Sequence, residues 1–144
     1  MSEDRPELSV LILDDEEHIR KILQLLLERA GYQVFTAPTG EDALTIAKVE
    51  HPEAILLDIV MPAMNGYDVL RRLKSDPDTR AIPVIMVTSR GSERDIATSF
   101  QLGALFYVEK PFETQDLLEK LRVAIVRAAN GDAAPSSAPD SLPA

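Results

Sequence analysis

The stretch LSVLILDD at residues 8–15 decides the fold. Its apolar part, residues 8–13, is short and nearly unbroken, which is typical of a parallel β-strand that is covered on both faces. Two more apolar runs, at residues 54–57 and 84–87, predict two further strands. Two aromatic or β-branched segments, at residues 32–36 and 105–108, predict another two.

Apolar residues at helical spacing lie between these strands. Ile19, Ile22 and Leu23 predict a first helix that ends before Gly31. Thr39, followed by Asp42, resembles a capping box at the start of a second helix. Three more helices are predicted at residues 67–74, 92–102 and 114–128. Five βα units in regular alternation predict a doubly wound α/β fold, in which a five-stranded parallel sheet carries helices on both faces.

The composition is that of a globular protein with an acidic surface. The 144 residues include 24 Asp and Glu against 15 Lys and Arg, so the formal net charge is -9. This balance disfavours nucleic-acid binding, which needs clustered basic side chains. The small basic group on the third helix, Arg71, Arg72 and Lys74, is expected to be a solvated face. The absence of cysteine excludes disulfides, thiolate zinc sites and thiol nucleophiles.

The domain organisation is expected to be simple. Residues 8–128 form one folded domain, preceded by a flexible arm at residues 1–7. Residues 129–144 are rich in Ala, Pro and Ser, and they bury too little apolar area to offset the entropy of ordering, so we expect a disordered tail or a linker. No apolar run approaches the roughly 20 residues that cross a bilayer, and the N-terminus does not resemble a secretory signal. We therefore expect a cytoplasmic protein without membrane contact.

Polar residues follow the predicted strands at the edge of the sheet where ligands bind in this fold class. They are Asp14 and Asp15 after the first strand, Asp58 after the third, Thr88 after the fourth, and Glu109, Lys110 and Pro111 after the fifth. Each residue alone has an ordinary explanation as a helix cap, a turn residue or a solvated charge. Three carboxylates placed together repel one another, however, and a bound cation makes such a cluster tolerable.

The chemistry of this set points to phosphoryl transfer. Oxygen ligands without His or Cys suit Mg²⁺, or alternatively Mn²⁺, rather than zinc. A lone Lys beside the carboxylates suits the neutralisation of a phosphoryl group. The combination indicates phosphoryl chemistry at a carboxylate nucleophile.

Four segments carry a family resemblance: LILDDEEHIRKIL (11–23), ILLDIVMPAMNGYDVLRRL (55–73), PVIMVTSR (83–90) and FYVEKPF (106–112). Together they resemble the receiver domain of two-component response regulators, and the chain is similar to single-domain chemotaxis-type regulators. The resemblance covers residues 8–128 and implies a flavodoxin-like fold with strand order 2-1-3-4-5. Met61-Pro62 and Asn65-Gly66 match the loop that follows the phosphoacceptor in this family.

The resemblance also implies a role for each residue of the site. Asp58 is the phosphoacceptor, and the metal is held by Asp58, by Asp15 directly, by Asp14 through water and by the main-chain carbonyl of Val60. Thr88 and Lys110 bind phosphoryl oxygens, and Tyr107 swings inward as Thr88 moves. The Lys110–Pro111 peptide bond is cis in the family, which aims the ammonium into the site.

The function that follows by resemblance is Mg²⁺-dependent transfer of a phosphoryl group to Asp58 from a phosphohistidine. The donor is a sensor histidine kinase or a histidine phosphotransfer protein, and later hydrolysis of the acyl phosphate resets the switch. Such a chain phosphorylates and dephosphorylates itself without being a turnover enzyme. Phosphorylation alters the face formed by the fourth helix, fifth strand and fifth helix, which binds a downstream protein effector, acts on a fused output domain, or forms a homodimer.

Three positions are expected to tune the site. Val60 is apolar where many relatives place a polar side chain, and it could obstruct the attacking water and prolong the phosphorylated state. Ser89 is small, as access to the phosphoryl group requires. Arg90 either reaches over the site or is solvated.

Two alternative functions fit these residues less well. One is an interaction module of the same fold that works without phosphorylation, but such a module has no need of clustered carboxylates. A Mg²⁺-dependent phosphatase or mutase of a related fold commonly has a second Asp two residues after the nucleophile, whereas Asp58 is followed by Ile59 and Val60.

Overall fold

The central strand β1 (Ser9–Leu13) is buried along its whole length. The computed structural model describes residues 8–60, 64–89 and 91–131. The expected arm at residues 1–7 and residues 132–144 of the expected tail lie outside the described residues. Within β1, Val10 and Ile12 join one apolar cluster while Leu11 and Leu13 join another on the opposite face. A strand that is covered on both faces was predicted, and the structure confirms it.

Five parallel strands form the sheet in the order β2-β1-β3-β4-β5. This is the order that the sequence predicted by resemblance. The other four are β2 (Gln33–Ala37), β3 (Ala54–Leu57), β4 (Val84–Thr88) and β5 (Phe106–Glu109). Because all strands run the same way, their carboxyl ends meet at one edge, where Leu13 is in register with Leu57 and Thr88 with Glu109.

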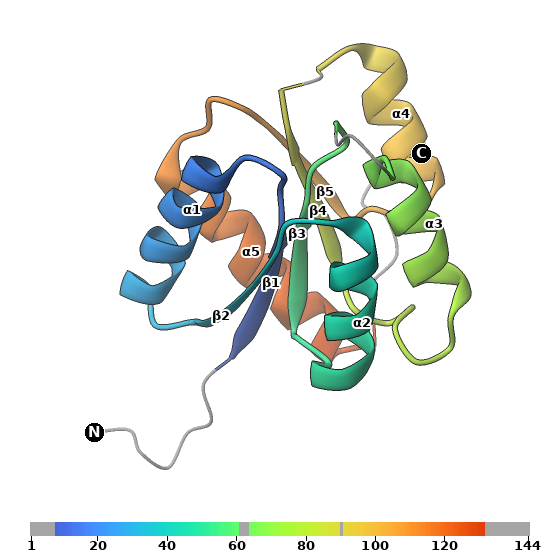
Figure 1. The fold of residues 1–144 in the computed structure, drawn as a ribbon, viewed down its shortest axis with the longest axis horizontal. Helices are drawn as coiled ribbons and strands as arrows, with labels where there is room; N and C mark the ends of the chain where they lie inside the picture. The colour runs from blue at the N-terminus through green and yellow to red at the C-terminus, as the bar shows by residue number, and fades with distance from the viewer. Residues whose placement is uncertain (1–7, 61–63, 90, 132–144) are drawn as a thin grey trace.

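Helices cover both faces of the sheet (Figure 1). Helices α1 (Glu17–Arg29) and α5 (Thr114–Ala129) pack on one face. The other face carries α2 (Gly40–Glu50), α3 (Gly66–Ser75) and α4 (Glu93–Gln101). Helix α5 ends one residue beyond the predicted boundary. No helix in the described part of the chain is long and apolar enough to cross a membrane.

Side-chain caps fix the starts of the three helices on the second face. The Oγ1 of Thr39 accepts a hydrogen bond from the amide of Asp42 at 3.2 Å, as the sequence predicted. Asn65 caps α3 in the same way through the amide of Asp68, at 3.1 Å. Such caps satisfy amides that have no partner within their own helix, so they specify where each helix begins.

A buried polar contact joins α3 to α4. Asp95 is 7% exposed, and its Oδ1 accepts a hydrogen bond of 2.6 Å from the hydroxyl of Tyr67. Its Oδ2 accepts another from Ser92 Oγ at 2.8 Å, while the Asp95 amide donates to the same Ser92 Oγ at 3.0 Å. The beginning of α4 is thus attached both to its own cap and to the neighbouring helix.

The basic group on α3 is not uniformly solvated, which corrects the prediction made for Lys74. Arg71 and Arg72 are exposed, but Lys74 is half-buried, and its Nζ donates to the carbonyls of Arg80 at 3.0 Å and Ile82 at 2.8 Å. Burial lowers the pKa of Lys74 to about 8. The side chain therefore closes the turn between α3 and β4.

Gly66 lets α3 begin directly against the end of β3. Its amide donates to the carbonyl of Ile59 at 2.8 Å, and a Cβ placed on Gly66 would contact the Asp58 carbonyl oxygen and lie 2.7 Å from the Ile59 Cα. These neighbours are main-chain atoms, which cannot rotate away. Only glycine permits this approach.

We predict that Gly66→Ala lowers the free energy of unfolding by about 1–3 kcal/mol, because it overpacks the backbone. Helix propensity alone predicts the opposite sign, a gain of up to about 1 kcal/mol. Gly40→Ala is the matched control, since Gly40 also opens a helix but faces the side chains of Val69 and Met64, which can move. Guanidinium unfolding measures both, and an equal or smaller loss in Gly66→Ala would contradict the clash.

Candidate functional site

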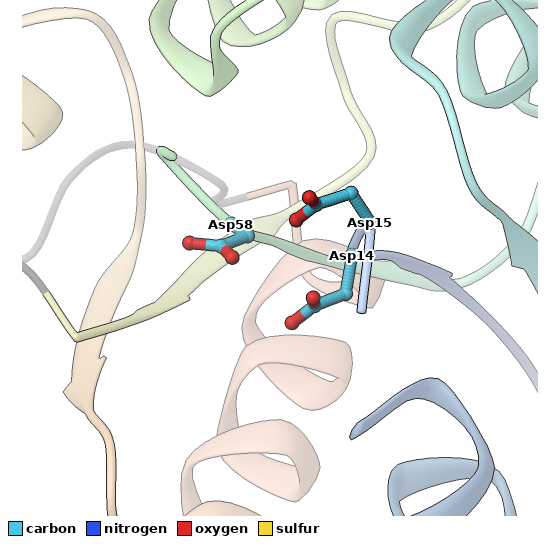
Figure 2. Close-up of side chains that lie close together, drawn as sticks. All are labelled: Asp14, Asp15 and Asp58. Carbon is cyan, nitrogen blue, oxygen red and sulfur yellow. The ribbon is translucent and has the colours of Figure 1, made fainter. Parts of the chain in front are cut away.

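Three carboxylates meet at the carboxyl edge of the sheet (Figure 2). Asp14 and Asp15 follow β1, and Asp58 follows the adjacent strand β3, where its amide donates to the carbonyl of Leu13 at 3.1 Å. One carboxylate oxygen from each of the three lies within 4.8 Å of the others. The parallel pairing of β1 with β3 therefore brings together acidic residues that are more than 40 positions apart in the sequence.

The three side chains differ in their access to solvent. Asp14 is 2% exposed and Asp58 is 5% exposed, whereas Asp15 is exposed. Buried carboxylates need donors or cations to offset the loss of hydration. The amide of Glu16 donates to Asp14 Oδ1 at 3.0 Å, and the amide of Val60 donates to Asp58 Oδ1 at 3.2 Å. The second oxygen of each buried carboxylate faces Lys110.

Lys110 supplies the positive charge at this edge. Its Nζ lies 2.7 Å from Asp14 Oδ2, 3.3 Å from Asp58 Oδ2 and 3.9 Å from Glu16 Oε1. Burial by itself would lower the pKa of Lys110, but the hydrogen bond to Asp14 and the charges of Asp58 and Asp14 outweigh it, so this pKa lies above its ordinary value. The ammonium therefore stays charged at neutral pH.

The main chain of Lys110 is attached to the end of β4. The amide of Lys110 donates to the Thr88 carbonyl at 2.8 Å, and the Lys110–Pro111 peptide bond is cis. The residue thus belongs to the end of the sheet, although its side chain reaches β1.

Thr88 and Tyr107 lie on neighbouring strands. Thr88 is fully buried at the end of β4. Tyr107 is half-buried and packs against the apolar cluster under α2 and α3, as does Tyr67. The positions are those expected for the two switch residues, and their roles remain predictions.

Two of the three expected tuning residues, Val60 and Ser89, are described by the structure. Val60 is 46% exposed, and Ser89 is exposed. Arg90, Met61 and Pro62 lie outside the described residues.

Sequence reasoning missed two residues at the site. Glu16 contributes a third carboxylate near Lys110, after Asp14 and Asp58. Arg20, in the first turn of α1, donates from Nη1 to the carbonyl of Asp14 at 2.7 Å. The acidic run Asp14-Asp15-Glu16 could have indicated Glu16, but no pattern marks a side chain that bonds to a main-chain carbonyl.

The donor set fits a hard divalent cation. The cluster offers only oxygen ligands, and its exposed member, Asp15, leaves room for the water molecules that Mg²⁺ retains. Three clustered carboxylates face one ammonium, so negative charge is left over for a cation to offset. The arrangement could therefore hold Mg²⁺.

Comparison with known proteins agrees with this geometry. Residues 10–122 match the model of the response regulator receiver domain. The chain belongs to this family. As a receiver domain it is 43% identical over 121 residues to "Probable transcriptional regulator ycf27" of Cyanophora paradoxa, an alignment that covers 84% of this chain and 49% of that protein.

Two other relatives match the receiver domain over nearly their whole length. Protein PilH of Pseudomonas aeruginosa is 38% identical over 116 residues, covering 81% of this chain and 96% of that protein. A CheY-like receiver domain protein of Methanospirillum hungatei has a similar crystal structure, with a TM-score of 0.82 and 29% identity over 88% of this chain and 99% of that one. By contrast, the chain spans about half the length of the transcriptional regulators it matches.

We predict that Lys110→Met lowers the free energy of unfolding by about 3 kcal/mol without Mg²⁺, because it leaves two buried carboxylates unpaired. Saturating Mg²⁺ should restore much of the lost stability, since the cation replaces the missing positive charge. For the same reason Mg²⁺ should bind the variant more tightly than the wild type. Denaturant unfolding with and without Mg²⁺ measures both effects.

The matched control is Lys120→Met, which removes an ammonium from the surface pair with Asp116 on α5. Surface pairs contribute less than about 1 kcal/mol, and this one is remote from the acidic cluster in sequence. If Mg²⁺ stabilises Lys110→Met no more than it stabilises Lys120→Met, Lys110 does not balance the charge of the cluster.

Proposed function

We propose that this receiver domain accepts a phosphoryl group on Asp58 from a phosphohistidine in a Mg²⁺-dependent reaction. The observation that carries the proposal is the surroundings of Asp58, a buried carboxylate in contact with one ammonium and clustered with two further carboxylates. These surroundings support a role for Asp58 as the nucleophile, for Lys110 as the phosphoryl-binding cation and for the clustered carboxylates as metal ligands.

The residues of the chain have separable tasks in this reaction. Two donors orient the Asp58 carboxylate, the amide of Val60 on Oδ1 and the ammonium of Lys110 on Oδ2. One carboxylate oxygen attacks phosphorus as the phosphorus–nitrogen bond to the histidine breaks. Lys110, already beside Asp58, stabilises the charge that spreads over the equatorial phosphoryl oxygens.

The metal requirement follows from the same charges. Asp14, Asp15 and Asp58, with the carbonyl of Val60, would hold Mg²⁺. When bound, the cation neutralises phosphoryl oxygens and reduces the repulsion between the incoming phosphoryl group and the carboxylates. The protein contributes the fixed spacing of those carboxylates.

Phosphorylation would then act as a switch. The modified Asp58 offers anionic oxygens to Thr88 and Lys110, and the packing of Tyr107 carries the change to α4, β5 and α5. That face would bind a downstream protein or a second copy of the chain, or it would act on an output domain. The transcriptional regulators among the relatives are consistent with an output domain in a longer protein. A sensor kinase or a histidine phosphotransfer protein in the cytoplasm would supply the phosphoryl group.

The test is a gain of the mass of one phosphoryl group, about 80 Da, when the protein meets Mg²⁺ and a small acyl phosphate. We predict this gain for the wild type in Mg²⁺, no gain in chelator, and no gain in Asp58→Asn, which keeps the size and one oxygen of the side chain but loses the nucleophile. Intact-mass spectrometry measures it. A panel of phosphorylated histidine kinases then repeats the test with a protein donor.

An equal gain of mass in Asp58→Asn would show that the phosphoryl group is attached to a residue other than Asp58. The absence of a gain from both donors, with Mg²⁺ bound, would favour an interaction module that works without phosphorylation.

Val60 is predicted to lengthen the life of the phosphorylated state. Its exposed apolar side chain follows Asp58 by two residues and gives an attacking water no hydrogen bond. We expect Val60→Asn to lose phosphate several-fold faster than the wild type, at unchanged Mg²⁺ affinity, because the backbone carbonyl is kept. The decay of the phosphorylated mass measures the rate. Val60→Leu is the apolar control, and a rate for Val60→Asn no faster than wild type would refute this role.

A further inference from the structure

Arg20 is a cation at the acidic site that the proposed function leaves without a task. It is half-buried in the first turn of α1, where its amide donates to the carbonyl of Glu16 at 3.0 Å. Among the residues that the structure describes, no carboxylate lies within 4.0 Å of its guanidinium. Instead, Nη1 donates to the main-chain carbonyl of Asp14 at 2.7 Å. The side chain thus makes its short hydrogen bond to the main chain of Asp14, a residue of the acidic cluster.

We propose that Arg20 is a positioning residue for the metal-binding carboxylates, because it fixes the peptide group that joins Asp14 to Asp15. The carbonyl of Asp14 belongs to that peptide group, and the group is planar. A donor that holds the carbonyl oxygen therefore also restricts the position of the Asp15 Cα, which lies in the same plane. This inference rests on the proposed function, since it assigns these carboxylates to Mg²⁺.

Asp15 depends on the main chain for its position. Its carboxylate is exposed and has no hydrogen-bond partner among the residues that the structure describes. Asp14, in contrast, is held through both side-chain oxygens, by the amide of Glu16 and by Lys110. The spacing between the two carboxylates is consequently set by the peptide group between them.

Among the described residues, the main chain of Asp14 makes one other hydrogen bond, and it is weak. The amide of Asp14 donates to the carbonyl of Ala37 over 3.4 Å, which is long for a hydrogen bond. The N-cap of α1, Glu16, makes no side-chain cap hydrogen bond. Arg20 therefore makes the short contact that ties α1 to the end of β1.

The direction in which the Mg²⁺ affinity changes when Arg20 is replaced distinguishes a positioning role from other roles of this residue. If Arg20 acted only through its charge, its removal would strengthen Mg²⁺ binding, because one positive charge near the site would be gone. If it only stabilised the fold, Mg²⁺ affinity of the folded protein would stay unchanged. Loss of a group that orients metal ligands weakens binding by about 10–100-fold.

The experiment compares four full-length proteins by calorimetric titration with MgCl₂, at a temperature where circular dichroism shows each to be folded. They are the wild type, Arg20→Met, Arg20→Lys and Lys21→Met. Lys21→Met is the charge control, because Lys21 is the next residue of α1 and, within the described part of the chain, pairs only with the exposed Glu17. Arg20→Lys keeps the charge and one donor, so it also serves if Arg20→Met proves unstable.

We expect Arg20→Met to bind Mg²⁺ about tenfold more weakly than the wild type, Arg20→Lys to recover part of the loss, and Lys21→Met to bind as tightly as the wild type or slightly more tightly. Binding by Arg20→Met that equals or exceeds wild-type binding would overturn the proposal. If Arg20→Met does not fold, the Mg²⁺ affinity of Arg20→Lys tests the proposal instead. An affinity of Arg20→Lys equal to that of the wild type counts against a positioning role for Arg20.

A metal-free readout separates this inference from the proposed function. The amide of Glu16 is bonded to Asp14 Oδ1 across the same turn, so its hydrogen exchange reports the order of the turn without Mg²⁺. We expect exchange about tenfold faster in Arg20→Met and unchanged in Lys21→Met. A wild type that binds no Mg²⁺ would refute the metal dependence proposed above. In that case faster exchange of this amide still supports the role of Arg20 in the turn, and unchanged exchange overturns it.

Discussion

Two carboxylates buried side by side at the edge of the sheet are the constraint on which the rest of the structure depends. Asp14 and Asp58 are almost fully removed from water, and like charges in such a place cost several kcal/mol unless donors and cations offset them. A main-chain amide donates a hydrogen bond to one oxygen of each carboxylate, and Lys110 donates to the other oxygen. Lys110 therefore contacts both carboxylates but offsets only one of their two charges, which leaves negative charge for a bound cation to offset.

The strand order creates this constraint. Because β1 lies between β2 and β3, the residues that follow β1 and β3 become neighbours, and both strands are too thoroughly covered by helices for their ends to shift independently. Gly66 tightens the arrangement further, since α3 starts against the main chain of Asp58 itself. The geometry of the acidic cluster is thus a property of the core as much as of the loops.

The sequence predicts most of this arrangement because the signals are local and periodic. Apolar runs locate the strands, and the residue after each run then falls at the carboxyl edge by the rule of parallel pairing. The contacts of Arg20 and Lys74 could not be predicted, because both side chains bond to main-chain carbonyls whose positions depend on the path of a turn. The bond between Tyr67 and Asp95 also escaped prediction, since it joins two helices whose relative placement no local pattern encodes.

The contact between Tyr67 and Asp95 constrains how the site can communicate with α4. Asp95 is bonded both to Ser92, within the start of its own helix, and to Tyr67 from α3. A rigid shift of α4 away from α3 must break the bond to Tyr67 and can keep the one to Ser92, whereas unwinding of the first turn must break the bond to Ser92. Tyr67 and Tyr107 pack against the same apolar cluster. The bond between Tyr67 and Asp95 is therefore a specific contact that any displacement of α4 from α3 has to give up.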